Sequence, residues 1–360
     1  MITRNARTVT ARILLVATLF SGNVLADSDS AFQREADEAI DGLEQLGYAG
    51  SVLVSRGDDL VYLRDSGVED TAACVPSYWI ASITKQFTAV AILLLHERNV
   101  LDIGDSISEY LPDVPTDKSG ITLFHLLTHT SGLQQNYAAD GIADREAAQN
   151  ALLAAELKTK PGAKFAYAND NYNLLAMIIE TSAGVTYEEF LSREILSPIQ
   201  MKHSGFWGMA LEGGTCVPTV AAELNEQFAS ANWGFRGATG MRASVQDLHA
   251  YMRSLQRHDI LSRESTAMLM GSHVTLPSGT EVGFNWFAQK TDNGQRVRFS
   301  RGQESFGGNA VIYDYPDRAL TIITATNAGP AETGEGPVEG WSRKTHQAMA
   351  DVFTKSASHR

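Results

Sequence analysis

The sequence predicts an α+β fold: one antiparallel sheet with the terminal helices on a face, and a helical lobe inserted between its strands. Strand-like segments lie near both ends of the 360-residue chain. Apolar residues at helical spacing fill the region between them. Alternating βαβ units, which would indicate a parallel sheet, do not occur in the pattern.

The chain begins its folded part with a helix and a hairpin. Apolar residues recur at helical spacing over 31–46, and Gly47 ends the pattern. The β-branched and aliphatic runs 51–54 and 60–63 then flank the turn-forming residues 56–59. This arrangement predicts a β-hairpin.

The middle and the end of the chain have different periodicities. Helices are expected over 84–98, 123–128, 171–182, 187–196 and 244–255. Strands are expected over 282–288, 296–300, 309–313 and 319–326, with a turn at Pro316-Asp317, before a final helix over 343–353. We therefore expect a single domain over 27–360. Its sheet lobe comprises about 27–80 and 280–360, and its helical lobe comprises about 81–279.

Residues 1–26 resemble a secretory signal peptide. Three arginines precede an eight-residue apolar stretch, 13–20, and Val24-Leu25-Ala26 suits a cleavage site. Eight apolar residues are too few to span a bilayer, which takes roughly 20. The sequence thus predicts an exported protein, periplasmic or secreted, with no membrane insertion after signal cleavage.

Charge and cysteine content narrow the possible partners. The net charge is −13, and removal of residues 1–26, with three arginines and no acid, makes it −16. Such a chain is a poor ligand for nucleic acid, so we expect a small-molecule or peptide substrate instead. Cys74 and Cys216 permit one disulfide in an oxidising compartment, but spacing alone does not show that they pair. The oligomeric state is not indicated.

Several kinds of catalytic site are excluded by their motifs. The sequence has no Gly-Lys dipeptide for a phosphate-binding P-loop and no Gly-x-Ser-x-Gly nucleophile elbow. His125 and His129 are four residues apart, but no third ligand stands at a useful spacing. We therefore expect no metal and no organic cofactor.

The segment Ser82-Ile83-Thr84-Lys85 is the main candidate for a nucleophilic site. Side chains at i and i+3 share a helix face, so the Lys85 amine can reach the Ser82 hydroxyl. A serine at a helix N-terminus also places its backbone N–H near developing negative charge. The other interpretation is a capping serine with a solvated lysine, since a chain of this length contains about one Ser-x-x-Lys by chance.

Tyr167-Ala168-Asn169, just before the helix expected at Asn171, supplies two further candidates. A phenol beside a Ser–Lys pair can relay a proton to a leaving group, and the Asn169 amide can orient Lys85 and a substrate carbonyl. The alternative is an ordinary loop in which Asn169 or Asp170 caps the helix.

These motifs resemble those of the serine β-lactamase-like family, which includes class C β-lactamases, D-alanyl-D-alanine carboxypeptidases and related esterases. The resemblance rests on 79–89 around Ser82, on 121–133, on 167–175 and on 237–247. It covers about residues 45–328 in the family's order. It implies a β-lactamase/transpeptidase-like fold, a Ser82 nucleophile, Lys85 as base and Tyr167 as proton relay.

The family's third motif, a Lys-Thr-Gly or His-x-Gly on the strand facing the nucleophile, is altered here. One alignment places Arg301 in the cation position and Gln303 where glycine is usual, with Glu304 as backbone oxyanion donor. We prefer it because it keeps a cation, which could bind a substrate carboxylate. A shift of one residue would instead make Ser300-Arg301-Gly302 the motif.

The resemblance implies an exported serine hydrolase that forms a Ser82 acyl-enzyme. Its substrate would be a D-Ala-type peptide, a β-lactam or a small ester, with Asn169, Arg301 and Gln303 contacting or orienting it. The alternative is a non-hydrolytic sensor of β-lactams or cell-wall fragments on the same fold. We favour the enzyme, because a protein that only binds needs no nucleophile, base and proton relay such as Ser82, Lys85 and Tyr167.

Overall fold

The structure, a computed structural model, describes residues 21–67, 74–206, 209–211, 213–218, 232–291, 294–303, 309–327 and 347–352. Most of the proposed signal peptide therefore lies outside the described residues, and helix α1 (Ser21–Glu44) begins within its last part. In the described part of the chain, no helix is both long and apolar enough to cross a membrane.

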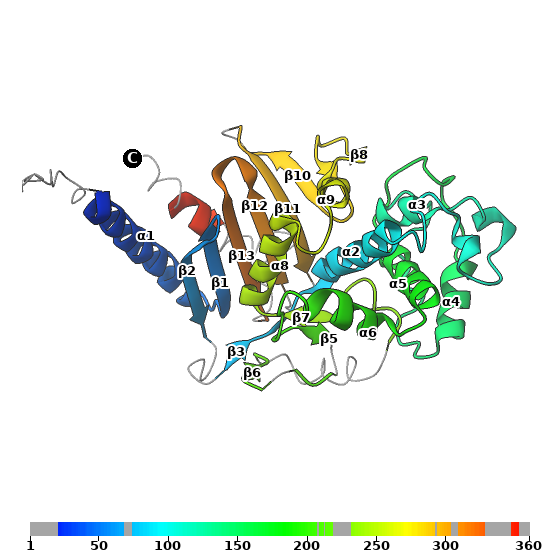
Figure 1. The fold of residues 1–360 in the computed structure, drawn as a ribbon, viewed down its shortest axis with the longest axis horizontal. Coiled ribbons are helices and arrows are strands. Elements are labelled where there is room, and N and C mark those ends of the chain that lie inside the picture. The colour runs from blue at the N-terminus through cyan, green and yellow to red at the C-terminus, as the bar shows by residue number, and fades with distance from the viewer. Residues whose placement is uncertain are drawn as a thin grey trace, which may run out of the picture.

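An eight-stranded sheet forms the centre of the molecule (Figure 1), in the order β2-β1-β13-β12-β11-β10-β9-β8. Every neighbouring pair in it is antiparallel, as the sequence predicts. Its strands are β1 (Gly50–Arg56), β2 (Asp59–Ser66), β8 (Val274–Thr275), β9 (Glu281–Val282), β10 (Phe287–Lys290), β11 (Arg296–Gln303), β12 (Asn309–Tyr315) and β13 (Leu320–Thr326). The hairpin β1–β2 joins the C-terminal strands through β13.

Alternating residues of the sheet face two separate hydrophobic clusters. In β1, Val52 and Val54 pack with Phe32 and Ile40 of α1, and the terminal helix over 347–352 adds Met349 and Val352 to the same cluster. The terminal helices therefore share one face of the sheet. Leu53 points to the opposite face, into the main core.

That main core is built around α2 (Thr84–Glu97), which lies between the sheet and the helices Leu123–Leu127, Arg145–Ala154 and Asn169–Ala183 (Figure 1). Every residue of α2 from Thr84 to Leu95 is buried, which accounts for the uninterrupted apolar run from Ala89 to Leu95. The remaining labelled α-helices are α3 (Leu123–Leu127), α4 (Arg145–Ala154), α5 (Asn169–Ala183), α6 (Tyr187–Leu191), α8 (Val245–Arg257) and α9 (Arg263–Met270). Shorter elements are the π-helix η4 (Ser192–Leu196) and the 3-10 turns η1 (Ala81–Ile83), η2 (Ile107–Glu109), η3 (Thr116–Lys118) and η5 (Pro316–Arg318). Helix α8 packs on β1 and β13, although it falls within the range expected for the helical lobe.

Several details differ from the predicted elements. The single strand expected over 282–288 is two strands, because the N–H of Gly283 donates to the Trp286 carbonyl and turns the chain between them. Helix α5 begins at Asn169 and not at Asn171, and α4 and α9 were not predicted. Of the final helix expected over 343–353, only 347–352 lies within the described residues, and it is helical.

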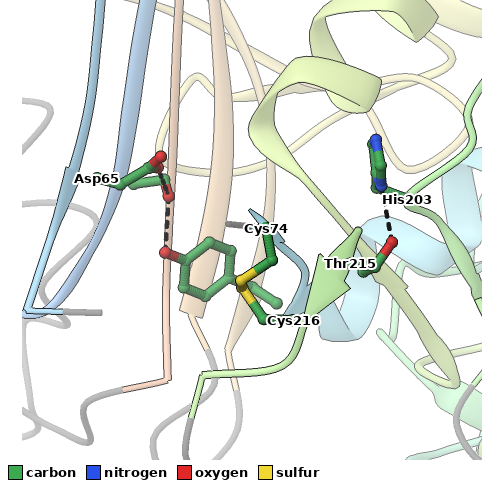
Figure 2. Close-up of a disulfide and its surroundings, with 7 residues drawn as sticks. Asp65, Cys74, His203, Thr215 and Cys216 are labelled. Atoms are coloured by element: carbon green, nitrogen blue, oxygen red, sulfur yellow. Dashed lines mark hydrogen bonds between the residues drawn. A yellow bond between two sulfur atoms is a disulfide. The ribbon is translucent and has the colours of Figure 1, made fainter. Parts of the chain in front are cut away.

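Two small sheets and a disulfide hold the segment before Ser82. Strand β3 (Val75–Pro76) pairs with β6 (Thr215–Cys216), and β4 (Tyr78–Trp79) pairs with β7 (Met241–Ala243), which also pairs with β5 (Gly205–Phe206). Cys74 and Cys216 form a disulfide with a Cα–Cα distance of 5.5 Å (Figure 2). The pairing that the sequence left open is thus present. Close by in Figure 2, the Thr215 hydroxyl and His203 Nδ1 are 2.7 Å apart.

We expect the disulfide to contribute substantially to stability, because it closes a loop of 142 residues. A Cys74→Ser/Cys216→Ser variant should lose about 2–5 kcal/mol of unfolding free energy, measured by urea denaturation. Dithiothreitol should destabilise the wild type similarly and leave the double variant unchanged. An equal denaturation midpoint for the variant and the oxidised wild type would contradict this expectation.

Candidate active site

Ser82 lies in the 3-10 turn η1, between strand β4 and helix α2. The turn is reached through Ala81, whose φ of 43° is unusual for a residue with a side chain. Ala81 and Ile83 are buried, whereas Ser82 is only half-buried. The turn therefore presents the hydroxyl of Ser82 from an otherwise buried segment.

Lys85 is fully buried one helical turn after Ser82. Its Nζ lies 3.1 Å from Ser82 Oγ, 2.8 Å from Asn169 Oδ1 and 3.0 Å from the Ala238 carbonyl oxygen. The last two atoms can only accept hydrogen bonds. A neutral Lys85 would use its two N–H donors on them and turn its lone pair toward the Ser82 hydroxyl. The geometry thus suits proton transfer from Ser82 to Lys85.

Tyr167 approaches the same hydroxyl from the other side. Its phenol oxygen lies 2.8 Å from Ser82 Oγ, and the Lys85 Nζ is 4.9 Å from the centroid of its ring. Asn169, the first residue of α5, holds Lys85 through Oδ1 and donates its backbone N–H to Gln135 Oε1 at 2.6 Å. The structure therefore brings together the four residues singled out in the first two motifs.

Strand β11 packs directly against the nucleophile turn at Gly302. A Cβ at this position would lie 2.9 Å from Ser82 N and closer still to the Ile80 carbonyl oxygen, so only glycine fits. Ser300 is buried on the same side of the strand, where its Oγ accepts from Gln86 Nε2 at 3.2 Å. The close approach thus falls on Gly302 and not on Gln303, which favours the shifted alignment Ser300-Arg301-Gly302.

The other predicted residues of the third motif lie on the opposite side of β11 or outside the described residues. Arg301 and Gln303 are exposed, and Glu304 belongs to the segment 304–308 that is not described. Strand β10 pairs with β11 only as far as Phe299, whereas β12 pairs with it through Gln303. From Ser300 to Gln303, β11 is therefore paired with a described strand on one edge alone.

Sequence reasoning missed Asn285, which lies between β9 and β10. Its side-chain Nδ2 donates to the Ser82 backbone carbonyl at 3.0 Å, and the Asn285 backbone carbonyl accepts from Gln86 Nε2 at 2.7 Å. Asn285 has a φ of 57°, a conformation that asparagine tolerates better than most residues. Within the expected strand, Gly283 and Asn285 are the residues that hinted at this break.

The segment around Gly237 supplies a backbone acceptor and a close packing point. The carbonyl of Ala238 binds Lys85, and a side chain on Gly237 would collide with the carbonyl of Tyr172 in α5. Asp247, in the same sequence motif, accepts from the His203 backbone and from the Ser204 hydroxyl, both at 2.7 Å. Asp247 therefore fixes β5 and its loop and does not contact Ser82.

No metal-binding site stands out among the described residues. Within the described ranges, no three or more His, Cys, Asp or Glu side chains are grouped to hold an ion. His125 Nδ1 accepts from the Thr122 backbone N–H and completes a capping box at the start of α3. His129 is buried against Tyr167, so the two histidines do not share a ligand position.

Comparison with known proteins agrees with this architecture. The family model described as Beta-lactamase matches residues 36–338. Penicillin-binding protein 4* of Bacillus subtilis (strain 168) is 27% identical over 316 residues, which are 79% of this chain and 69% of that protein. The octameric penicillin-binding protein homologue from Pyrococcus abyssi has a TM-score of 0.72 at 23% identity, over 90% of this chain and 77% of that one. A D-stereospecific amidohydrolase from Streptomyces sp. has a TM-score of 0.68 at 21% identity, over 89% and 98% of the two chains.

The fold is therefore of the β-lactamase/transpeptidase-like class, and the α+β prediction is confirmed. The family model covers the central sheet, the helices around α2 and the segment of every motif quoted above. The chain belongs to the Beta-lactamase family, as its motifs indicated.

Asp170, next to Asn169 in the first turn of α5, is a buried carboxyl group in this region. Among the described residues, neither of its oxygens meets a partner at ordinary hydrogen-bond distance. Burial raises the pKa of Asp170 to about 6, assisted by the negative charge of Asp140 and opposed by the Ala138 backbone amide. The native state thus binds this proton more tightly than the unfolded chain does.

We expect Asp170→Asn to stabilise the protein in a pH-dependent way. Protonation of Asp170 favours the native state at low pH, and this contribution is lost as the pH rises through about 6. The variant should therefore exceed the wild type by up to about 3 kcal/mol near pH 7.5 and converge with it near pH 4. Urea denaturation across this range measures the difference, with the exposed Asp59→Asn as control. A difference that stays constant with pH would refute the assignment.

Proposed function

We propose that this protein is a serine hydrolase that forms an acyl-enzyme on Ser82. One observation carries the proposal: Ser82 Oγ lies within hydrogen-bond distance of both Lys85 Nζ, at 3.1 Å, and the Tyr167 hydroxyl, at 2.8 Å. A nucleophile with an adjacent base that a third group orients is the arrangement that covalent catalysis requires. Asn169 and the Ala238 carbonyl act as the orienting groups.

In the first step, Ser82 Oγ attacks a substrate carbonyl carbon, and its proton passes to Lys85 directly or through Tyr167. The oxyanion accepts a hydrogen bond from the backbone N–H of Ser82. The second donor we propose is the N–H of Gln303, which follows Gly302 on the open edge of β11, in place of Glu304. A donor of this kind lowers the barrier by about 2.7–4 kcal/mol.

The tetrahedral intermediate then collapses and the bond to the leaving group breaks. Tyr167 delivers a proton to the departing amine or alcohol and recovers one from Lys85. Water attacks the Ser82 ester in the second half-reaction, and the same two groups accept its proton and return one to Ser82. The cycle consumes one water and needs no redox partner.

The substrate class we propose is an amide, peptide or ester carbonyl with a nearby carboxylate, as in D-Ala-type peptides and β-lactams. Arg301 supports this, although it points away from the Ser82 turn. Its exposed guanidinium lies beside the open edge of β11, where it can bind in bidentate fashion a carboxylate that extends past that edge. The D-stereospecific amidohydrolase of the same fold is one precedent for amide substrates. Small esters stay within the scheme, because the chemistry at Ser82 is the same for them.

We also propose that the protein is exported. The arginines and the apolar stretch of 1–26 support this, and so does the Cys74–Cys216 disulfide, since such bonds persist in oxidising compartments. Export would place Ser82 where cell-wall peptides and β-lactams are found.

Replacing Ser82 with alanine should abolish both turnover and covalent labelling. We expect kcat/KM to fall by about 10⁴-fold or more, because nucleophile and base act as a unit. The assay panel is a chromogenic cephalosporin, a short-chain p-nitrophenyl ester and a D-Ala-D-Ala peptide, with mass spectrometry after a fluorophosphonate. Hydrolysis retained by Ser82→Ala would exclude the proposed nucleophile. Rapid acylation of the wild type without release of product would instead indicate a sensor.

Arg301→Ala should raise KM about tenfold for carboxylate-bearing substrates and leave neutral esters nearly unchanged. A charge-assisted hydrogen bond at an exposed site accounts for a change of this size. Arg296→Ala, on an exposed residue at the far end of β11, serves as the matched control. The same loss for both substrate types would show that Arg301 does not bind the carboxylate.

A further inference from the structure

His129 lies between the loop that carries Tyr167 and the turn that carries Ser82. It is fully buried and has a φ of 56°. Its ring stacks on the Tyr167 ring, with centroids 4.4 Å apart and an interplanar angle of 30°. The Tyr172 ring lies 5.1 Å away, so His129 fills the space behind the proposed proton relay.

The hydrogen bonds of His129 define its tautomer. Nδ1 accepts the backbone N–H of Ala168 at 3.2 Å, and a backbone amide can only donate. Asn171 Nδ2 lies 3.2 Å from the same nitrogen, and its Oδ1 is held by the Ser131 hydroxyl at 2.6 Å. The ring proton of the neutral imidazole is therefore on Nε2.

The opposite side of the ring faces Asn285. In the described part of the chain, neither His129 Nε2 nor Asn285 Oδ1 has a partner at ordinary hydrogen-bond distance. The Asn285 side chain is close enough to act on the ring, since Asn285 as an acceptor opposes the lowering of the His129 pKa by burial and by the Lys85 charge. The remaining Asn285 donor, Nδ2, binds the Ser82 carbonyl oxygen at 3.0 Å.

We propose that His129 and Asn285 are a pair of positioning residues that fix Tyr167 relative to Ser82. The path that we propose runs from the Ala168 N–H to His129 Nδ1 and from Asn285 Nδ2 to the Ser82 carbonyl. Its middle link would join His129 Nε2 and Asn285 Oδ1, two buried atoms with no other partner among the described residues. The path connects both ends of the 2.8 Å contact between the Tyr167 hydroxyl and Ser82 Oγ. This inference rests on the proposed function and adds two residues that act through Ser82 and Tyr167.

The pair works only while His129 is neutral. A second proton on Nδ1 would remove the acceptor for Ala168 and place a cation near Lys85. Burial and the Lys85 charge lower the pKa of His129 well below its usual range, so the ring keeps this acceptor at neutral pH.

Asn285→Gly tests the pair with little risk to folding, because glycine adopts the φ of 57° at least as easily as asparagine. The matched control is Asn99→Gly, at an exposed residue with a φ of 55° after α2. We expect Asn285→Gly to lower the acylation rate about 10- to 100-fold, as a small misplacement of reacting groups does, with KM within about twofold. The melting temperature should fall moderately, because Asn285 is buried and its hydrogen bond to the Ser82 carbonyl is lost, so the rates are measured well below the unfolding transition. Asn99→Gly should keep wild-type stability and kinetics.

A second readout does not depend on activity. In protein labelled with ¹⁵N-histidine, NMR should show His129 as the Nε2–H tautomer, and Asn285→Gly should shift its Nε2 resonance while Asn99→Gly does not. The two single variants, His129→Asn and Asn285→Gly, break the same path. The double variant should therefore be as active as the less active of the two single variants.

The outcomes separate this inference from the proposed function. A wild type that forms no Ser82 adduct overturns the function, whatever the NMR spectra show. An active wild type whose Asn285→Gly variant acylates at the normal rate, or whose Nε2 resonance is unmoved, overturns the positioning pair. A fall in activity that merely follows a fall in melting temperature overturns it as well.

Discussion

The contact between Gly302 and the turn at Ser82 is the constraint on which the rest of the site depends. It places strand β11, from the C-terminal part of the chain, against the start of α2, from the N-terminal part, at a distance that allows no side chain. Ser82 N therefore lies beside the open edge of β11. The antiparallel sheet holds β11 through β12, and the buried helix α2 holds Lys85 against Asn169 and Ala238. Fold and site are fixed by the same packing.

Local signals predicted the parts of the structure that depend on neighbouring residues. The β1–β2 hairpin, helix α2 and the Ser82–Lys85 spacing were all readable, because turn residues and helical periodicity act over a few positions. Features that depend on packing between distant residues could not be predicted from the sequence. Asn285 binds Ser82 across a separation of 203 residues. The close approach of Gly302 to the Ser82 turn is also a tertiary contact, and without it we preferred the alignment that keeps Arg301 in the cation position. The Cys74–Cys216 pairing needed a Cα distance that no spacing provides.

The site surrounds one buried amine with neutral groups. Lys85 meets a hydroxyl, an amide oxygen and a backbone carbonyl, and two tyrosine rings lie within 6 Å of its nitrogen. His129, the nearest other basic side chain named in the site, is held uncharged. Acceptors that do not ionise at neutral pH leave Lys85 able to exist as amine or ammonium. A carboxylate in the place of Asn169 would favour the ammonium and weaken it as a base.

The pairing of β1 with β13 has a consequence for the order in which the chain acquires its structure. Residues 50–56 find their inner partner only at 320–326, so the N-terminal hairpin stays at an edge without support until nearly all of the chain has been synthesised. Pairings of such large sequence separation form slowly, since the ends of a long loop must meet first. The central sheet of such a chain therefore stays incomplete while most of the chain is being made. That delay would suit the export proposed above, because a chain must be unfolded to pass through a narrow translocation channel.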